Sequence, residues 1–420
     1  MFFLYQIFIA ILLILSPLII GFRILKGKED RLRFKEKFCF PSKKRGGGNL
    51  VWFHGSSVGE ILSILLLVHE LEKNRFINKI LITSSTLSSA EIFKKFKFKK
   101  TVHQFFPIDS ILYSHKFLNY WRPTIAVFVE SEIWPSIFNA LNKKSIPLLL
   151  LNARITKKTF NKWNYIKSFS NSVFKNISKA YPQNNETLNY LKKLNVSKNK
   201  VIGNLKFISN DQDKLIKLDG LLLKNLKNRK VWCASSTHSG EEIICSKVHL
   251  SLKKKYKNLL TIIIPRHVHR VGKIIHEIND LKLNVVLHSS NPKKIDNADI
   301  YLVDTYGETK KFYNTSDIVF MGKSLTGKGG QNPLEPARHG AAVLHGPNID
   351  NFSDIYKLLN KLKITQKVNG VASLTSLVNK LMIKKNSKKN YLKIEKIGKK
   401  ILNNTKDEIN SLLNNEIKKT

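Results

Sequence analysis

Residues 49–71, NLVWFHGSSVGEILSILLLVHEL, decide the fold class of this chain. The first part, Asn49 to Phe53, is a short apolar segment that favours a β-strand, and the last part repeats apolar residues at helical spacing. The polar sequence HGSSVGE, residues 54–60, joins the two parts and places Glu60 in the first turn of the helix. A strand that leads through a polar turn into a helix is the building unit of a parallel α/β sheet.

Glu60 has two interpretations. Ser57 and Glu60 fit a capping box, in which the serine hydroxyl accepts from a backbone N–H of the first turn and the glutamate accepts from the serine N–H. Gly55 and Gly59 weaken this interpretation, because a glycine in the first turn costs about 1 kcal/mol against alanine and lets another molecule approach the backbone. The carboxylate is therefore either a helix cap or a reactive group, and this stretch leaves both open.

Short apolar runs alternate with helical patterns along the rest of the chain, as in buried parallel sheets. The first set of runs lies at 49–55, 79–85, 125–132 and 147–154, with helical patterns at 60–73 and 89–96 and a further strand expected just before Gly203. The second set lies at 230–236, 259–267, 283–290, 299–304, 317–322 and 341–346. We therefore expect an α/β protein with two doubly wound parallel sheets and a cleft between them.

The expected organisation has five parts. They are a membrane anchor at 1–22, a first Rossmann-like domain at 23–207, a Lys- and Asn-rich linker at 208–228, a second Rossmann-like domain at 229–375 and a Lys-rich helical tail at 376–420.

The first 22 residues, MFFLYQIFIAILLILSPLIIGF, carry no charge. As a helix they would reach about 33 Å, enough for a ~30 Å hydrocarbon core. Basic residues follow from Arg23 to Lys37, which by the positive-inside rule keeps the downstream protein cytoplasmic. We expect an uncleaved anchor, with a buried core helix as the alternative, and Pro17 leaves open a kinked segment that lies in one leaflet.

Composition narrows the function classes. The net charge is +42, from 72 Lys and Arg against 30 Asp and Glu, and such a field favours nucleic acid, anionic lipid or phosphorylated substrates. Hydrophobic residues make up 42% of the chain, which indicates a globular protein rather than a disordered one. The three cysteines have neither metal-ligand nor redox spacing, so a disulfide framework is excluded and a reducing compartment fits.

Polar motifs follow the predicted strands, at the carboxyl ends where open parallel sheets bind ligands. In the first half these are HGSSVGE, FVESEIWP with Glu130 and Glu132, and GNLKF with Asn204 and Lys206. Carboxylates and a lysine at neighbouring strand ends indicate a catalytic or binding site.

In the second half the strand ends carry ASSTHSGEE, PRHVHR, DTYGE and the glycine-rich GKSLTGKGGQNPLEP. Glycines 327, 329 and 330 let the backbone approach an anion, and Glu335 is placed to accept from ribose hydroxyls. An ordinary turn is the alternative for the glycine-rich loop, as a solvated basic turn is for PRHVHR. The histidines 238, 267 and 269 lack a carboxylate cluster and metal-site spacing, so we expect no metal and no cofactor.

Taken in order, these motifs resemble the 3-deoxy-D-manno-oct-2-ulosonic acid (Kdo) transferases of lipopolysaccharide synthesis. The resemblance extends over most of residues 1–355 and includes the anchor, LNARI and GPNIDNF. It implies the GT-B fold, and inverting, metal-independent transfer of Kdo from CMP-Kdo to a lipid A precursor at the cytoplasmic face of the inner membrane. The partners implied are CMP-Kdo, the lipid A precursor and anionic lipid of the inner membrane, with no nucleic acid.

The resemblance also implies roles for particular residues. Glu60 corresponds to the general base, and Glu130 and Lys206 correspond to groups that stabilise the transition state. The residues that correspond to CMP contacts are Pro265, Arg266, Tyr306, Gly307, Glu308, Asn332, Pro333, Leu334 and Glu335.

The motifs depart from the family pattern at five positions. Gly55 and Ser56 replace two alanines, Tyr306 replaces a methionine, Ser239 a proline and Gln331 a histidine. The change at Tyr306 puts the side-chain part of that nucleotide contact in doubt, and none of the changes removes a proposed catalytic group.

Two rival functions follow from the same sequence. One is a GT-B enzyme that uses a UDP-sugar and another lipid acceptor, against which SVGE followed by ESEIWP argues. The other is a membrane-tethered nucleic-acid-binding protein, motivated by the charge of +42. That second function needs a nucleic-acid-reading motif or aromatic residues interleaved with the basic runs, and the sequence contains neither.

Overall fold

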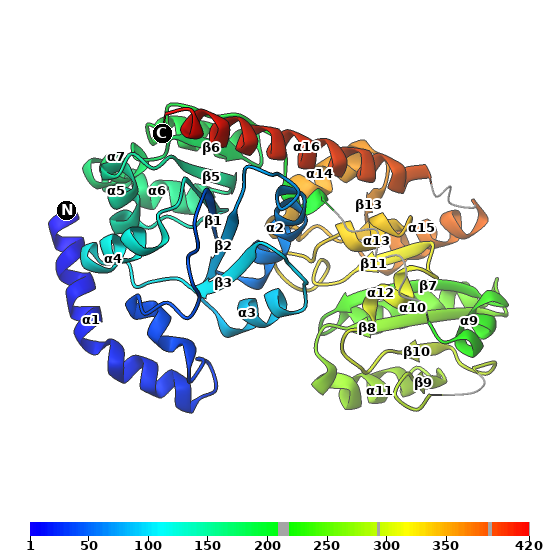
Figure 1. The fold of residues 1–420 in the computed structure, drawn as a ribbon. Coiled ribbons are helices and arrows are strands. Elements are labelled where there is room, and N and C mark those ends of the chain that lie inside the picture. Colours follow the sequence, from blue (N-terminus) through cyan, green and yellow to red (C-terminus); the bar gives the residue numbers. More distant parts are fainter. Residues whose placement is uncertain (209–217, 292–294, 385–388, 420) are drawn as a thin grey trace. The chain divides into compact units, whose positions relative to one another are not determined.

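The computed structural model describes residues 1–208, 218–291, 295–384 and 389–419 (Figure 1). The chain forms two compact units, one of Met1–Ile208 with Gly398–Thr420 and one of Ser209–Ile397. Of the linker predicted at 208–228, residues 209–217 lie outside the described residues, and helix α9 (Gly220–Lys227) occupies most of the rest.

The first unit contains a six-stranded parallel sheet in the order β3-β2-β1-β4-β5-β6. Its strands are β1 (Leu50–His54), β2 (Lys79–Ser84), β3 (Thr101–Phe105), β4 (Ile125–Val129), β5 (Leu148–Ala153) and β6 (Lys179–Pro182). Every residue of β1, β4 and β5 is buried, which is why these strands have continuous apolar sequences. The four predicted strands are confirmed as β1, β2, β4 and β5, whereas β3 and β6 were not predicted.

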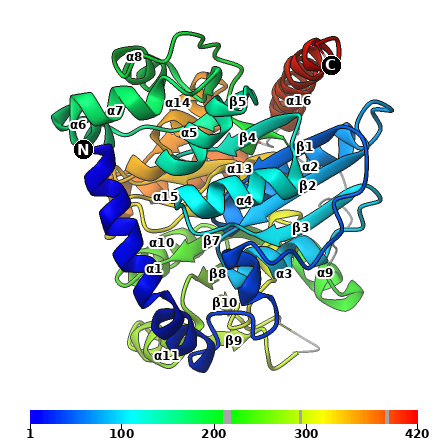
Figure 2. The ribbon, with the colours of Figure 1, turned by 60° about the vertical axis from the view of Figure 1, so that its left-hand side comes forward.

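Helices cover this sheet, and Figure 2 shows α4 lying across one face of it. The helices are α1 (Phe2–Leu25), η1 (Arg33–Phe38), α2 (Val58–Leu71), α3 (Leu87–Lys94), α4 (Ile111–Trp121), α5 (Pro135–Lys143), α6 (Lys157–Tyr165), α7 (Lys167–Phe174), α8 (Asn185–Lys193) and η2 (Leu205–Phe207). Aromatic side chains fill the space between sheet and helices, where the Trp52 ring lies 4.8 Å from Phe117 and 5.1 Å from Phe128.

The second unit contains a seven-stranded parallel sheet in the order β13-β12-β11-β7-β8-β10-β9. Its strands are β7 (Lys230–Thr237), β8 (Leu259–Pro265), β9 (Val285–Leu287), β10 (Ile300–Leu302), β11 (Ile318–Met321), β12 (Ala342–His345) and β13 (Thr365–Lys367). The six predicted strands are all present, and β13 is an additional edge strand.

The second unit has mostly short helices. They are α9, α10 (Glu241–Lys253), η4 (Val268–Arg270), α11 (Val271–Asn279), α12 (Thr309–Tyr313), α13 (Leu334–Arg338), η5 (Asp350–Phe352), α14 (Ser353–Lys361) and α15 (Val371–Ile383), followed by α16 (Lys389–Ile417), which passes into the first unit.

One predicted strand is wrong. The segment just before Gly203 forms no strand, and Asn199 makes a single bridge to Ala180. The chain turns away from the sheet at Gly203, whose φ of +117° is incompatible with an extended ladder. A Cβ atom at this position would lie 2.8 Å from the Ile401 side chain, so glycine also allows α16 to pack closely here.

The predicted tail at 376–420 is helical, and its last part packs on the first unit. Glu408 of α16 pairs with Lys179 at 2.5 Å and with Lys200, and it accepts from the Tyr181 hydroxyl at 2.8 Å. These contacts attach the end of the chain to strand β6 and the segment after it.

Candidate active site

In each sheet the polar motifs lie at the switch point, where later strands begin to be added on the other side of the first strand. In the first sheet β1 lies between β2 and β4, and in the second β7 lies between β8 and β11. The loops leave such strands in opposite directions, so a crevice opens at their carboxyl ends and ligands bind there. In one unit this places HGSSVGE beside FVESEIWP, and in the other it places ASSTHSGEE beside the loop that begins at Gly322.

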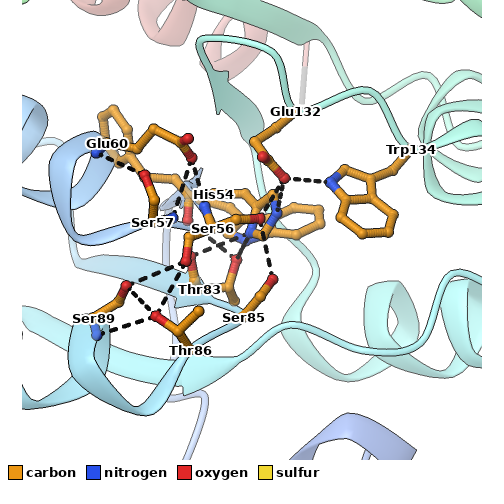
Figure 3. A network of polar contacts seen from close by, with 12 residues as sticks. His54, Ser56, Ser57, Glu60, Thr83, Ser85, Thr86, Ser89, Glu132 and Trp134 are labelled. Atoms are coloured by element: carbon orange, nitrogen blue, oxygen red, sulfur yellow. Dashed lines mark hydrogen bonds and ion pairs between the residues drawn. The ribbon is translucent and has the colours of Figure 1, made fainter. Parts of the chain in front are cut away.

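Glu60 caps the N-terminus of α2. Ser57 Oγ accepts from the Glu60 backbone N–H at 3.3 Å, and Glu60 Oε2 accepts from the backbone N–H groups of Ser57 at 3.4 Å and Ser56 at 2.7 Å (Figure 3). These contacts form the predicted capping box. Both backbone bonds to the carboxylate end on Oε2, so the cap uses one of the two carboxylate oxygens.

The pKa of Glu60 is raised above its ordinary value. Burial is the largest cause, because it disfavours the charged form, and the negative charge of Glu132 adds to it; hydrogen bonds from Ser57 and the Ser56 N–H oppose the shift. A carboxylate with a raised pKa is a stronger base at neutral pH. The cap and the base are therefore compatible roles for one side chain.

Glu132 lies close to this carboxylate and is held by three donors. Its Oε2 accepts from the Ser56 hydroxyl at 2.5 Å, from Trp134 Nε1 at 2.8 Å and from His54 Nε2 at 3.1 Å (Figure 3). Burial raises the pKa of Glu132, but the hydrogen bonds outweigh burial and bring the pKa below its ordinary value. The residue therefore stays charged, and it supplies part of the field that raises the pKa of Glu60.

His54 fixes the position of Glu132. The imidazole is wholly buried, which lowers its pKa and keeps the ring neutral. Because a charged Glu132 only accepts, His54 Nε2 carries the proton, and Nδ1 then accepts from the Thr83 hydroxyl at 3.0 Å. The ring also stacks on Phe106 with centroids 3.8 Å apart, so the histidine has one orientation.

Glu130 and Lys206, 76 residues apart, form an ion pair. Lys206 Nζ lies 2.8 Å from Glu130 Oε1, and Asn152 Nδ2 donates to the same oxygen at 3.4 Å. Asn152 Oδ1 in turn accepts from the Leu205 N–H at 3.1 Å and so ties the end of β5 to the turn that carries the lysine. The structure thus brings together the two residues predicted to stabilise the transition state.

Glu130 and its partner Asn152 both have left-handed backbone conformations. Glu130 has φ of +57° and Asn152 has φ of +53°. Asparagine adopts this conformation readily, but for glutamate it costs on the order of 1–3 kcal/mol, and such strained residues concentrate at functional sites. The turn at Glu130 breaks the alternation of β4, which is why Glu130 and Glu132 have different partners.

In the second unit the predicted residues occupy three loops at the carboxyl edge of the sheet. Pro265 ends β8, and the Arg266 backbone N–H donates to the Thr237 carbonyl at 3.0 Å while its side chain is exposed. Tyr306, which replaces a methionine of the family pattern, follows β10 and is 76% exposed. Gly307 and Glu308 complete that loop, with Glu308 Oε2 2.7 Å from Lys311 Nζ.

The third loop leads into α13. Asn332 Oδ1 accepts from the Leu334 N–H at 3.1 Å and so fixes the turn that enters the helix, whose N-cap is Pro333. Pro333 and Leu334 are buried, whereas Glu335 is half-buried in the first turn. The Tyr356 hydroxyl donates to the Gln331 carbonyl at 3.1 Å and holds this end of the loop from α14.

Strand order sets the distance between these loops. Strands β10, β8, β7 and β11 are consecutive neighbours. At about 4.8 Å per strand, the loop with Tyr306 and the loop that leads to Asn332 leave the sheet roughly 14 Å apart. A ligand that contacts both loops near the sheet must therefore be extended.

Glu241 clamps the glycine-rich loop and was not predicted. Its Oε1 accepts from the N–H groups of Ser324 and Leu325, both at 2.9 Å. Its Oε2 accepts from the N–H groups of Lys323 at 2.7 Å and His238 at 2.9 Å. This fully buried carboxylate joins the start of α10 to the loop after β11.

Close backbone packing explains the glycine that starts this loop. A Cβ atom on Gly322 would lie 2.4 Å from the Ser236 carbonyl oxygen. A second buried pair lies next to the clamp, where Glu242 binds Arg270 through two bonds of 3.0 and 3.1 Å. The motif ASSTHSGEE indicated this region, but neither carboxylate could be assigned a partner without the fold.

The described residues contain no group of three or more His, Cys, Asp or Glu side chains that could hold a metal ion. The rings of His238 and His269 each lie 5.5 Å from the ring of His267. They form a histidine cluster beside Arg266 rather than a carboxylate-containing ligand set.

Comparison with known proteins agrees with this geometry. Residues 32–209 match the model of a family described as 3-deoxy-D-manno-octulosonic-acid transferase (kdotransferase). A 3-deoxy-D-manno-octulosonic acid transferase of Rickettsia bellii is 34% identical over 409 residues, which cover 95% of this chain and 96% of that protein. The corresponding protein of Haemophilus influenzae is 31% identical over 423 residues, which cover 96% of each chain.

The fold has a solved counterpart. The structure of a glycosyltransferase from Rickettsia africae is 12% identical and superposes with a TM-score of 0.57, covering 89% of this chain and 100% of that one. The likeness concerns the fold alone, and with the two doubly wound sheets it confirms the GT-B class that the motifs implied.

Proposed function

Because this chain belongs to the Kdo transferase family of glycosyltransferases, we propose that it transfers Kdo from CMP-Kdo to a hydroxyl group of a lipid A precursor in lipopolysaccharide synthesis. The observation that carries the proposal is Glu60, a carboxylate of raised pKa at the switch point of the first sheet. We place the reaction at the cytoplasmic face of the inner membrane.

Glu60 is the general base of this reaction. A sugar hydroxyl is a poor nucleophile until its proton is removed, and a carboxylate on a rigid helix N-terminus can accept that proton. The Ser56 and Ser57 N–H groups hold Oε2, so the carboxylate has a fixed orientation during the reaction. A single displacement at the anomeric carbon inverts its configuration and releases CMP.

Lys206 and Arg266 stabilise negative charge in place of a metal ion. The phosphate of CMP gains charge as the bond to the sugar breaks, and fixed cationic donors stabilise that charge in the transition state. Glu130 orients the Lys206 ammonium at 2.8 Å. Arg266 extends into solvent at the end of β8, where it can pair with phosphate.

The second unit binds the nucleotide of the donor. Loops after β8, β10 and β11 contribute Arg266, Gly307, Asn332 and Glu335, and Glu335 accepts from ribose hydroxyls. The span of roughly 14 Å between these loops suits an extended nucleotide sugar rather than a single ion.

The test of the proposal is product analysis with the full-length protein. Incubation with CMP-Kdo and a tetraacylated lipid A precursor should produce one or more mass increments of Kdo, and their number reports how many residues the enzyme adds. Transfer from a UDP-sugar with no transfer from CMP-Kdo would overturn the proposal, as would tight DNA binding without transfer.

We predict that the reaction needs no divalent metal. Lys206 and Arg266 supply the positive charge, so protein treated with a chelator should keep most of its turnover with CMP-Kdo. Rates measured with a chelator and then with added magnesium check this. A complete loss that magnesium restores would show that a metal takes part.

A further inference from the structure

Helix α1 has two opposite faces. One face is buried or half-buried and consists of Phe2, Tyr5, Ile9, Ser16 and Ile20. The opposite face is apolar and exposed and consists of Leu4, Phe8, Ile11, Leu15, Leu18, Phe22 and Leu25. At about 100° per residue the two sets lie on opposite sides of the helix along nearly its whole length.

The N-terminal end of α1 is held by the globular part of the first unit. The Tyr5 hydroxyl donates to Asp109 Oδ2 at 2.6 Å, and Gln6 Nε2 donates to Ser136 Oγ at 2.9 Å. The rings of Phe2 and Tyr5 lie 6.3 and 5.8 Å from the ring of Phe169 in α7. In Figures 1 and 2 this end of α1 lies beside α7.

The segment that follows α1 is held at the same place. The Ile108 N–H donates to the Lys37 carbonyl at 3.0 Å, and Glu36 Oε2 accepts from the Phe105 N–H at 2.7 Å. Ile108 and Asp109 are adjacent, so neighbouring residues hold the chain on both sides of the apolar helix.

These two attachments are incompatible with a helix that crosses a membrane. A helix of 24 residues extends about 36 Å, and crossing would place Tyr5 and Lys37 on opposite sides of a ~30 Å hydrocarbon core. We propose that α1 instead lies in the plane of one leaflet, with its exposed face among the acyl chains of an anionic bilayer and its buried face against the protein.

Charge at both ends of α1 supports this orientation. Exposed basic residues follow its C-terminal end at positions 26, 28, 31 and 35, and further lysines lie at 157, 158, 162 and 167 in and next to α6 and α7 at its other end. Each lysine or arginine near an anionic surface contributes about 1 kcal/mol of attraction. If α1 crossed the membrane while keeping its contacts with α7, the lysines of α6 and α7 would lie on the far side, against the positive-inside rule.

The apolar surface continues beyond the helix. Ile111 and Leu112 come directly after Asp109 and Ser110 and are 43% and 69% exposed. Tyr165, at the end of α6, is 91% exposed, and tyrosine is typical of the membrane–water interface. Helix and flanking residues together form a membrane-binding surface of apolar centre and basic rim.

Depth measurements test the proposal on the full-length protein bound to vesicles that contain anionic lipid. Single cysteines at Leu4, Ile14 and Leu25, which are 59%, 78% and 82% exposed, receive a fluorophore, since the native cysteines are all buried. Spin-labelled lipids should quench the three positions equally and from a shallow depth. Strong deep quenching at Ile14 with shallow quenching at the other two would show a crossing helix, and no quenching at any position would show that lipid is not the partner.

Sidedness gives an independent test. A cysteine in a short extension before Met1 should react with an impermeant maleimide only in inverted membrane vesicles, in parallel with the control Lys43→Cys on an exposed loop. Reaction of the N-terminal cysteine in intact spheroplasts would overturn the proposal.

Discussion

Glu60 and Glu132 are two carboxylates of one site whose pKa values shift in opposite directions. Burial and like charge raise the pKa of Glu60, whereas three hydrogen bonds lower that of Glu132 despite its burial. A pair of titratable groups separated in this way distinguishes the group that takes a proton from the group that stays charged. The assignment of Glu60 as base therefore rests on its surroundings in the structure as well as on the motif.

We predict that Glu60→Gln loses turnover without losing stability. Glutamine also serves in a capping box, so the melting temperature should stay close to that of the wild type. An amide does not take the proton of the acceptor, so kcat should fall by about 10²–10⁴-fold while CMP-Kdo still binds. Steady-state kinetics and thermal melts measure the two effects separately.

Ser57→Ala is the matched control. It removes the hydroxyl that caps α2 and keeps the carboxylate, so it should cost about 1 kcal/mol of stability and leave most of the turnover. If Glu60→Gln retained near-normal turnover, Glu60 would be a cap alone and the base would have to be another group.

The acid limb of the pH–rate profile should depend on Glu132. The charge of Glu132 raises the pKa of Glu60, so Glu132→Gln should lower that pKa and move the acid limb of kcat to lower pH. The control Glu70→Gln lies on α2, the helix of Glu60. It should leave the acid limb in place, because Glu70 pairs with Lys73 at the helix surface. An acid limb that does not move in Glu132→Gln would mean that Glu60 is not the titrating base.

At the scale of elements, one carboxylate holds the start of α10 against the loop after β11. We predict that Glu241→Gln weakens nucleotide binding and lowers the melting temperature of the second unit. The amide group would face the N–H groups of Lys323 and His238, and each charge-assisted bond lost costs about 1.5–3 kcal/mol. Calorimetric titration with CMP and a thermal melt check this.

Glu277→Gln serves as its control, because Glu277 pairs only loosely with Lys273 on α11, at 3.7 Å. Unchanged CMP affinity in Glu241→Gln would show that the loop is not part of the nucleotide site.

Most strands were predictable because a buried parallel strand has a continuous apolar sequence. Strand β3 escaped prediction because its sequence, TVHQF, contains His103 and Gln104, which are buried as polar groups. His103 is accommodated by a hydrogen bond to the Ser84 hydroxyl at 2.8 Å, a contact between strands that no local pattern reveals. Strands β6 and β13 have the sequences KAYP and TQK, which lack the continuous apolar run that marks the other strands.

The contacts of the site likewise divide into those that a local sequence pattern predicts and those that depend on which strands are neighbours. The capping box of Ser57 and Glu60 is local, so four residues were enough to predict it. The contacts of Glu132 with His54 and Ser56 require β1 and β4 to be neighbours in the sheet. The clamp of Glu241 likewise requires β7 beside β11, so only the tertiary structure reveals it.

At the scale of the whole molecule, the chain ends on the unit in which it began. Residues Gly398–Thr420 belong to the first unit, although Ser209–Ile397 form the second. The attachment is ionic as well as apolar, because Glu408 lies between Lys179 and Lys200. A carboxylate that pairs with two lysines and a tyrosine hydroxyl should contribute to the stability of this unit.

We predict that Glu408→Gln destabilises the first unit at neutral pH and has little effect in acid. Burial raises the pKa of Glu408, but its bonds with Lys179, Lys200 and Tyr181 outweigh burial and bring the pKa to about 2. A lowered pKa means that the contribution is present above the unfolded-state pKa and is lost as the pH falls towards 2. The melting temperatures of wild type and variant should therefore differ at pH 7, by about 2–4 °C per kcal/mol, and converge between pH 4.5 and 2.

Tryptophan fluorescence can follow this transition, because four of the five tryptophans, at 52, 121, 134 and 163, lie in the first unit and one, at 232, lies in the second. Glu416→Gln is the control on the same helix, since Glu416 pairs with Lys419 within its own chain segment. That variant should melt like the wild type at every pH. If Glu408→Gln also melted like the wild type at pH 7, the ion pairs of α16 would contribute nothing, and apolar contacts such as that of Ile401 with Gly203 would have to hold the helix on the first unit.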